Sequence, residues 1–178
     1  MEPVAVTGRS AARLVVVVAL FVVVQETVAI KLRIAGIHPE LMLLVPIAAG
    51  TAAGPREGAI AGFVAGIAID LLLPTPFGLT ALVGCLTGVG VGRVTGSLTR
   101  EIPWFSGLVA FTASAGAVIL YAVLGAVLGQ EQFLRVDLVA LVLVVAVTNA
   151  VLAPFGMRIV RWALGPAAHP RSAAGSSW

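Results

Sequence analysis

Charged side chains are scarce in this chain. Lysine, arginine, aspartate and glutamate together make up 11% of its 178 residues, and the mean hydropathy is +1.09. Soluble domains carry roughly 25% charged residues. If this chain were a soluble domain, it would have too few polar side chains to cover its surface. The composition therefore indicates an integral membrane protein. The high pI is then better explained by basic residues beside membrane spans than by binding to nucleic acid.

Residues that usually build catalytic and metal sites are also few. Cysteine occurs once, at Cys85, which excludes a disulfide within the chain and a cysteine-based metal site. The two histidines, His38 and His169, fall in a predicted loop and tail, so no paired-histidine protease motif exists. Acidic residues are isolated from one another, and Ser106 and Ser114 have no evident base nearby. We therefore expect no enzyme activity, no cofactor and no bound metal.

Six stretches are apolar enough to form membrane-spanning helices. About 20 apolar residues cross a hydrocarbon layer roughly 30 Å thick. The short second stretch is interrupted by Pro46, so a tilted, kinked or partly re-entrant helix is expected there, and five spans are the alternative. The predicted fold is an all-α, six-helix membrane bundle over residues 12–164, between cytoplasmic tails at 1–11 and 165–178, the latter disordered. The predicted spans are 12–30, 40–54, 57–74, 77–97, 104–128 and 136–162.

The basic residues favour one orientation of these spans. With the N-terminus in the cytoplasm, eight basic residues lie inside and three outside, as the positive-inside rule requires. Both termini are therefore predicted to be cytoplasmic. The inner set is Arg9, Arg13, Arg56, Arg93, Arg100, Arg158, Arg161 and Arg171, and the outer set is Lys31, Arg33 and Arg135.

Glycines recur every fourth residue in two neighbouring spans. Residues four apart lie on one face of a helix, so each set forms a stripe. Glycine is a poor helix former in water, but a stripe without side chains lets two backbones approach closely in a membrane. The spacing predicts tight packing of the third and fourth spans, either with each other or with a partner helix. The stripes are Gly58, Gly62, Gly66 with Asp70, and Gly84, Gly88, Gly92, Gly96.

Asp70 lies on the first stripe and is expected to face protein. A charged Asp at the centre of a span costs roughly 2.5–3.5 kcal/mol on insertion scales. Three interpretations compete: a hydrogen-bonding anchor, a contact with a partner, and a cation or proton site. The few other polar residues in the spans, such as Gln25 and Asn149, are too few for a proton relay, so the anchor interpretation leads.

Three stretches of the first half of the chain carry an ordered set of motifs. The stretch "VVVQET" carries Gln25, and "GIHPELMLL" carries Pro39, Glu40 and Leu41. The stretch "GAIAGFVAGIAIDLLLPTPFGLTAL" then supplies Gly58, Gly62, Phe63, Gly66, Asp70 and Gly78. The order of these motifs resembles the rod shape-determining protein MreD family. The resemblance covers the first half of the chain by order and spacing, and the second half in length and hydropathy. With Gly84 and Gly88 of the second stripe, the residues of these motifs are those that we expect to serve structure or partner binding.

The resemblance implies a non-enzymatic component of the cell-elongation machinery in the bacterial plasma membrane. Family members bind the single transmembrane helix of MreC, and with it support a peptidoglycan polymerase, a penicillin-binding transpeptidase and the MreB filament. The implied fold is similar to the substrate-binding subunits of energy-coupling-factor vitamin transporters. Such a subunit is the alternative function, but it needs an aromatic-lined outer pocket, and Phe77 and Phe133 are almost the only aromatic residues near predicted outer ends.

Overall fold

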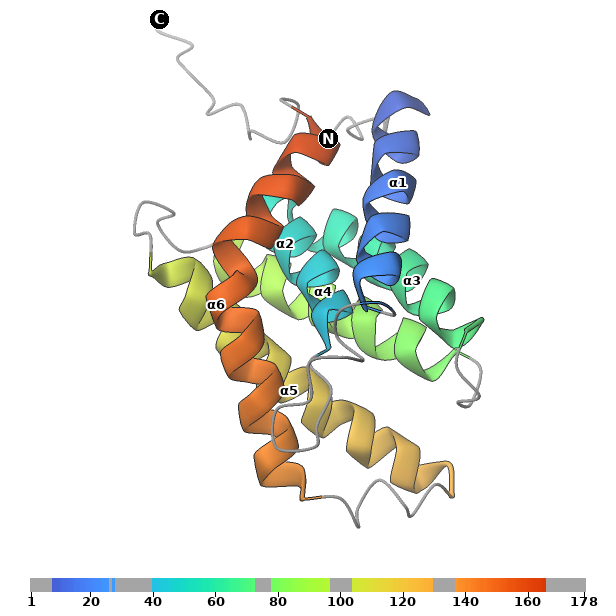
Figure 1. The fold of residues 1–178 in the computed structure, drawn as a ribbon, viewed down its shortest axis with the longest axis vertical. Coiled ribbons are helices and arrows are strands. Elements are labelled where there is room, and N and C mark those ends of the chain that lie inside the picture. Colours follow the sequence, from blue (N-terminus) through green and yellow to red (C-terminus); the bar gives the residue numbers. More distant parts are fainter. Residues whose placement is uncertain are drawn as a thin grey trace, which may run out of the picture.

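The structure, a computed structural model, describes residues 8–25, 27, 40–72, 78–96, 104–129 and 137–165. Within these ranges the chain forms six α-helices, one short 3₁₀ helix (η2) and no strand, which confirms the all-α class (Figure 1). The helices are α1 (Gly8–Val24), η2 (Leu41–Leu43), α2 (Leu44–Ala53), α3 (Pro55–Asp70), α4 (Leu79–Gly96), α5 (Phe105–Val127) and α6 (Leu138–Leu164).

Three of the described helices, α4, α5 and α6, are long and apolar enough to cross a membrane. Two further apolar segments, Ala12–Val24 and Leu41–Ala53, are shorter. The six predicted helices are therefore present, and the chain has the helices of a multi-pass membrane protein. That all six cross the bilayer stays a prediction. The expected tail at 165–178 and Pro39 lie outside the described residues, apart from Gly165 at the end of α6.

The η2–α2 segment forms the centre of the bundle. Every residue from Leu41 to Ala52 is buried, and α2 packs against α3, α4 and α6. The interruption expected at Pro46 takes the form of a 3₁₀ turn followed by an α-helix. Because α2 begins at Leu44, Pro46 lies in its first turn, where a missing N–H removes no α-helical hydrogen bond. The ten residues of α2 are about 15 Å long, half the thickness of the hydrocarbon layer.

One residue, Gly54, connects α2 to α3. Its φ is +103°, a conformation that favours glycine, and Pro55 then occupies the first position of α3, where its fixed φ suits a helix start. This turn folds α3 back along α2, and α4 packs on both.

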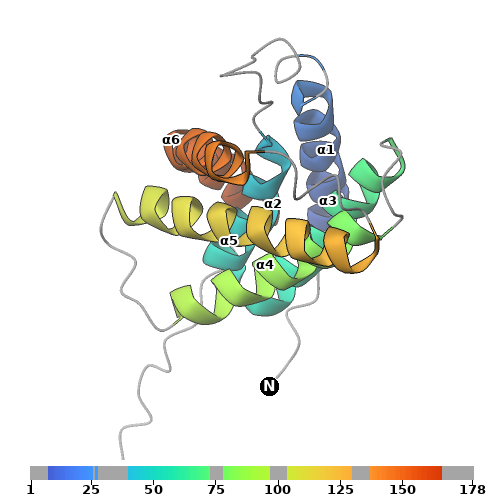
Figure 2. The ribbon, with the colours of Figure 1, turned by 90° about the horizontal axis from the view of Figure 1, so that it is seen from below.

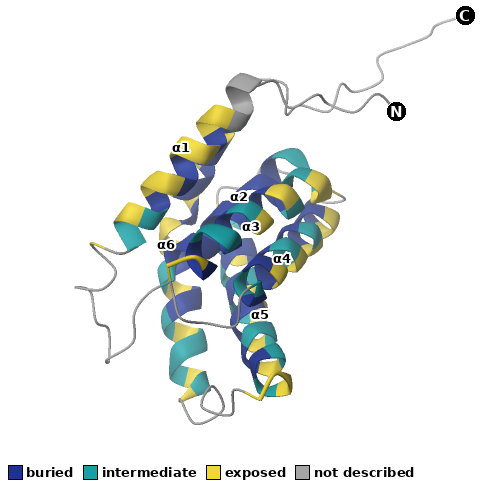
Figure 3. Cartoon of the chain, turned by 90° about the vertical axis from the view of Figure 1, so that its right-hand side faces the viewer, coloured by how far each residue is buried: buried dark blue, intermediate teal, exposed yellow. Residues whose placement is uncertain are grey.

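Helices α5 and α6 pack along each other, and part of this pair extends beyond the other helices (Figures 1 and 3). Large apolar side chains are exposed there, for example Val127 (77%) on α5 and Val139 (70%) on α6. Exposed apolar faces of this kind suit contact with lipid, because hydrocarbon tails are as apolar as these side chains.

Candidate functional site

The two glycine stripes pack directly against each other. A Cβ added to Gly62 would overlap the backbone of Gly84, and one added to Gly88 would overlap the backbone of Gly58. Gly66 likewise lies against the backbone of Ala81. The predicted apposition of the third and fourth spans is therefore confirmed, and of the two options it is the one within the chain. Close backbone approach gives these helices dispersion contacts that no side chain separates.

The same contacts decide against the other option, in which the stripes pack on a partner helix. The space beside Gly58, Gly62, Gly84 and Gly88 is already filled by neighbouring backbones of the chain itself. Their side of each helix is the inside of the bundle.

The glycine contact is larger than the two stripes indicate. Gly50 of α2 lies against the backbone of Gly88, and Gly92 of α4 lies against Pro55. Sequence reasoning missed Gly50, although the four-residue spacing extends upstream through Gly54 to it. Gly96, the last member of the second stripe, has open space where a Cβ would be. The contact thus joins α2, α3 and α4 and ends before Gly96.

Asp70 connects the end of α3 to the beginning of α4. Its carboxylate accepts hydrogen bonds from the backbone N–H groups of Gly78 (2.9 Å), Thr80 (3.3 Å) and Ala81 (3.2 Å), and its side chain is 4% exposed. The first N–H groups of a helix have no partner within the helix and carry its positive end, so a carboxylate there is favourable. Gly78, with φ of +94°, provides the turn into α4. These are the hydrogen bonds of a structural anchor.

A second polar contact fixes the entry to η2. The peptide between Glu40 and Leu41 is bound on both sides: Leu41 N–H donates to Gln25 Oε1 (2.8 Å), and Asn149 Nδ2 donates to the Glu40 carbonyl (3.0 Å). Gln25 follows α1 and Asn149 lies midway along α6, so one peptide unit joins three parts of the bundle. The carbonyl of Glu40 and the N–H of Leu41 thus have hydrogen-bond partners within the chain at the start of the buried segment, as buried backbone groups require.

Asn149 also reaches α5. Its Nδ2 donates to Ser114 Oγ at 2.9 Å, and both side chains are fully buried. Asn149 therefore forms hydrogen bonds between helices. Its Oδ1 atom is buried without a partner in the described part of the protein.

Most residues named from the sequence face the interior of the bundle, and one faces outward. Glu40 belongs to the interior group: it is half-buried, and with Gly62, Gly66 and Thr80 it lines a small cavity of about 10 Å³. Gln25, Asp70 and the glycines of the two stripes, except Gly96, bind or pack within the bundle. Phe63 differs, because it points out of α3 and is 52% exposed.

The described residues contain no group of three or more His, Cys, Asp and Glu placed to hold a metal ion. The glycine contact, the Asp70 hydrogen bonds and the hydrogen bonds of Gln25 and Asn149 have a structural effect. They fix where α1, η2, α3, α4, α5 and α6 lie relative to one another.

Comparison with known proteins identifies the family. A model of the rod shape-determining protein MreD family matches residues 9–160, from α1 into α6, so the match includes the second half of the chain as well as the first. No curated protein and no solved structure matched the chain. The match covers most of the chain, and the chain therefore belongs to the rod shape-determining protein MreD family.

Proposed function

We propose that this protein is a non-catalytic membrane component of the bacterial cell-elongation complex. In this role it binds an MreC-like single-pass protein and supports peptidoglycan synthesis by a polymerase, a penicillin-binding transpeptidase and an MreB-like filament. The observation that carries the proposal is the family match over residues 9–160. The interior supports it, since the side chains of the family-like residues Gln25 and Asp70 accept hydrogen bonds from backbone N–H groups of the chain itself, and the backbone carbonyl of Glu40 accepts one from Asn149.

The partner helix then needs an outer face, because the glycine stripes are filled. We place it on the exposed side of α3. Ile60, Phe63 and Leu71 are 40%, 52% and 69% exposed there, at helical spacings that put them on one side. Phe63 is also the exposed one among the six residues of the stretch 58–82 that carry the family resemblance, which are Gly58, Gly62, Phe63, Gly66, Asp70 and Gly78. A large aromatic side chain on such a face is the usual anchor of an interface.

The direct test is co-purification of the partner with Phe63→Ala. Truncation of an interface anchor costs about 2 kcal/mol or more, roughly a 30-fold loss of affinity. Recovery of the co-expressed MreC-like protein should therefore fall, and rod shape should not be restored in cells that lack the native protein. Phe155→Ala is the matched control, because Phe155 is 73% exposed on α6 and lies on a different face. Wild-type recovery with Phe63→Ala would reject this face.

We further propose a plasma-membrane location with both termini in the cytoplasm. Arg13 lies over the ring of Trp162, with 5.4 Å from its guanidinium carbon to the ring centre, so the beginning of α1 and the end of α6 lie at the same end of the bundle (Figure 1). The contact between Arg13 and Trp162 supports the proposal that both termini lie on the same side of the membrane. Protease protection of terminal tags in spheroplasts tests it, and cleavage of either tag from outside would contradict it.

The alternative, a vitamin-binding transporter subunit, has less support. Small-molecule sites enclose about 300–1,000 Å³ and include a few polar groups. The cavity beside Glu40 measures about 10 Å³, and a larger space of about 280 Å³ between α4 and α5 has almost entirely apolar walls. Similarity to the energy-coupling-factor subunits stays a prediction.

A further inference from the structure

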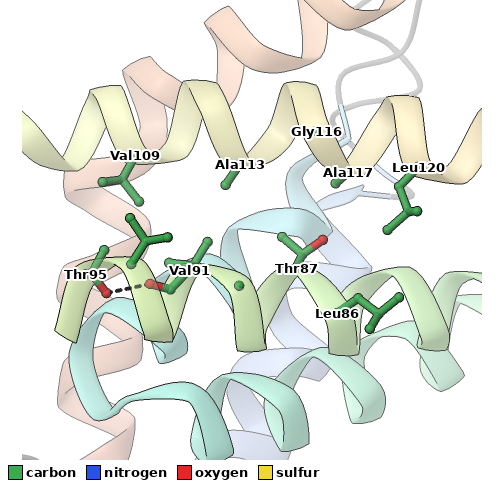
Figure 4. Close-up of a pocket in the computed structure, with 11 residues that line it drawn as sticks. Leu86, Thr87, Val91, Thr95, Val109, Ala113, Gly116, Ala117 and Leu120 are labelled. Atoms are coloured by element: carbon green, nitrogen blue, oxygen red, sulfur yellow. Dashed lines mark hydrogen bonds between the residues drawn. The ribbon is translucent and has the colours of Figure 1, made fainter. Parts of the chain in front are cut away.

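A groove lies between α4 and α5, on the side of α4 that does not face α3. It measures about 280 Å³, and apolar side chains from both helices line it, including Leu86 and Val94 of α4 and Val109 and Leu120 of α5 (Figure 4). Figure 2 shows α5 between α4 and α6, so the groove belongs to the outer part of the bundle. Of its two threonines, Thr95 already donates its hydroxyl to the carbonyl of Val91 at 2.7 Å.

Two glycines widen this groove. Gly90 on α4 and Gly116 on α5 line it, and a Cβ added to either would meet no atom within 4 Å. These glycines differ from Gly62 and Gly84, whose missing side chains are replaced by backbone. At Gly90 and Gly116 no atom of the described chain fills the space of the missing side chain.

The size of the groove favours a narrow occupant. A helix with its side chains is about 10–12 Å across, so a single turn of it fills roughly 400–600 Å³. That is more than the whole groove, and a helix would lie across the opening without entering. A hydrocarbon chain is narrow and flexible, and it requires only the apolar walls that the groove has.

Arg93 of α4 does not line the groove, but helical spacing places its positive charge next to the lining residues. Arg93 follows Leu86 by seven residues, two helical turns, and so lies on the same side of α4 as this groove residue. It is exposed in the last turn of α4, and no acidic side chain of the described ranges pairs with it, since their one ion pair joins Arg56 and Glu57. Basic residues at the membrane border beside a gap between helices attract anionic lipid headgroups.

We propose that the groove between α4 and α5 binds one acyl chain of an anionic phospholipid, with the phosphate of its headgroup beside Arg93. The groove and the charge of Arg93 contribute separately to lipid binding. The walls bind the chain of any phospholipid, and Arg93 adds the preference for negative charge.

Native mass spectrometry of the delipidated full-length protein tests this site. Phosphatidylglycerol and phosphatidylcholine with identical acyl chains are titrated separately. The wild type should bind one phosphatidylglycerol at least ten-fold more tightly than phosphatidylcholine. Arg93→Gln should abolish that preference and leave phosphatidylcholine binding unchanged. Arg158→Gln, which alters an exposed arginine on α6, is the matched control and should keep the preference.

Filling the groove tests its walls. Gly116→Leu should weaken binding of both lipids at least ten-fold, and Gly90→Leu provides a second variant on the opposite wall. Gly96→Leu is the control, because Gly96 is also open but does not line the groove. Circular dichroism of each variant shows whether it is folded. Equal affinities of the wild type for the two lipids, or unchanged binding in both groove variants, would overturn the proposal. So would a photo-crosslinker at position 116 that attaches to a polypeptide in the membrane and not to lipid.

Discussion

The two sides of α4 use glycine in opposite ways. On the α3 side, Gly84 and Gly88 lie against Gly62 and Gly58, and backbone fills the space of each missing side chain. On the α5 side, Gly90 and Gly116 face open space in a groove. Glycine in a membrane helix therefore has two distinct structural meanings, and only what lies opposite decides between them.

The difference follows from position on the helix. Gly84 and Gly88 are four residues apart and share a face, whereas Gly90 lies two residues after Gly88 and turns away from it. The same residue type thus makes a rigid contact on one face and a cavity on another. Rigidity of α2, α3 and α4 and openness beside α5 are consequences of one short stretch of sequence.

The largest expected effect comes from filling the α3–α4 contact. Gly62→Leu places a side chain where the Gly84 backbone lies, so the helices must separate. We expect the free energy of unfolding to fall by more than about 3 kcal/mol, which exceeds ordinary overpacking because backbone cannot rotate away. Thermal unfolding in detergent measures it. Gly116→Leu is the matched substitution on the open side, and equal stability of the two variants would remove the contrast.

A smaller effect is expected where α4 begins. Asp70→Ala leaves the N–H groups of Gly78, Thr80 and Ala81 without their acceptor, which should cost about 2–3 kcal/mol of unfolding free energy. Asp137 gives the comparison, because it is exposed and its carboxylate accepts one hydrogen bond among the described residues, from Ala140 N–H (3.3 Å) at the beginning of α6.

Asp137→Ala should cost about 1 kcal/mol, as loss of an ordinary helix cap does. If Asp70→Ala loses no more unfolding free energy than Asp137→Ala, the hydrogen bonds of the buried Asp70 carboxylate do not hold α4 against α3.

The third prediction concerns the connection of this rigid part to α6. Gln25 and Asn149 bind opposite sides of one peptide, so Gln25→Ala and Asn149→Ala should not be additive. A double-mutant cycle on thermal unfolding should give a coupling energy of about 1 kcal/mol. Additive effects would mean that the two contacts act independently.

Much of the fold was predictable because hydropathy and helix length are local properties. The fourth span, predicted at 77–97, is the helix Leu79–Gly96, and the sixth, predicted at 136–162, is Leu138–Leu164. The first span, predicted at 12–30, overlaps the helix Gly8–Val24, and most of its last residues lie outside the described ranges. The short buried η2–α2 segment was recognised as unusual through Pro46, but its central position depends on the helices around it.

The site was less predictable because its contacts are distant in sequence. Spacing showed that Gly62 and Gly84 lie on small-residue faces, but it did not say that these faces meet. The sequence favoured a hydrogen-bonding anchor at Asp70, but it did not identify the N–H groups around the start of α4 as the donors. Gln25 and Asn149, which bind opposite sides of one peptide, are more than one hundred positions apart, and no local pattern indicates that they share it. Gly90 and Gly116 follow no common spacing, and the groove they open is visible only in three dimensions.

The most direct test of the glycine contrast is the pair Gly62→Ala and Gly90→Ala, compared by thermal unfolding in one detergent. A single methyl group should destabilise the protein by about 1–3 kcal/mol at position 62, because it overlaps the Gly84 backbone. At position 90 the same methyl group meets open space and should stabilise α4 by about 0.5–1 kcal/mol through helix propensity. Opposite signs are the predicted result, and a stabilising Gly62→Ala would contradict the account.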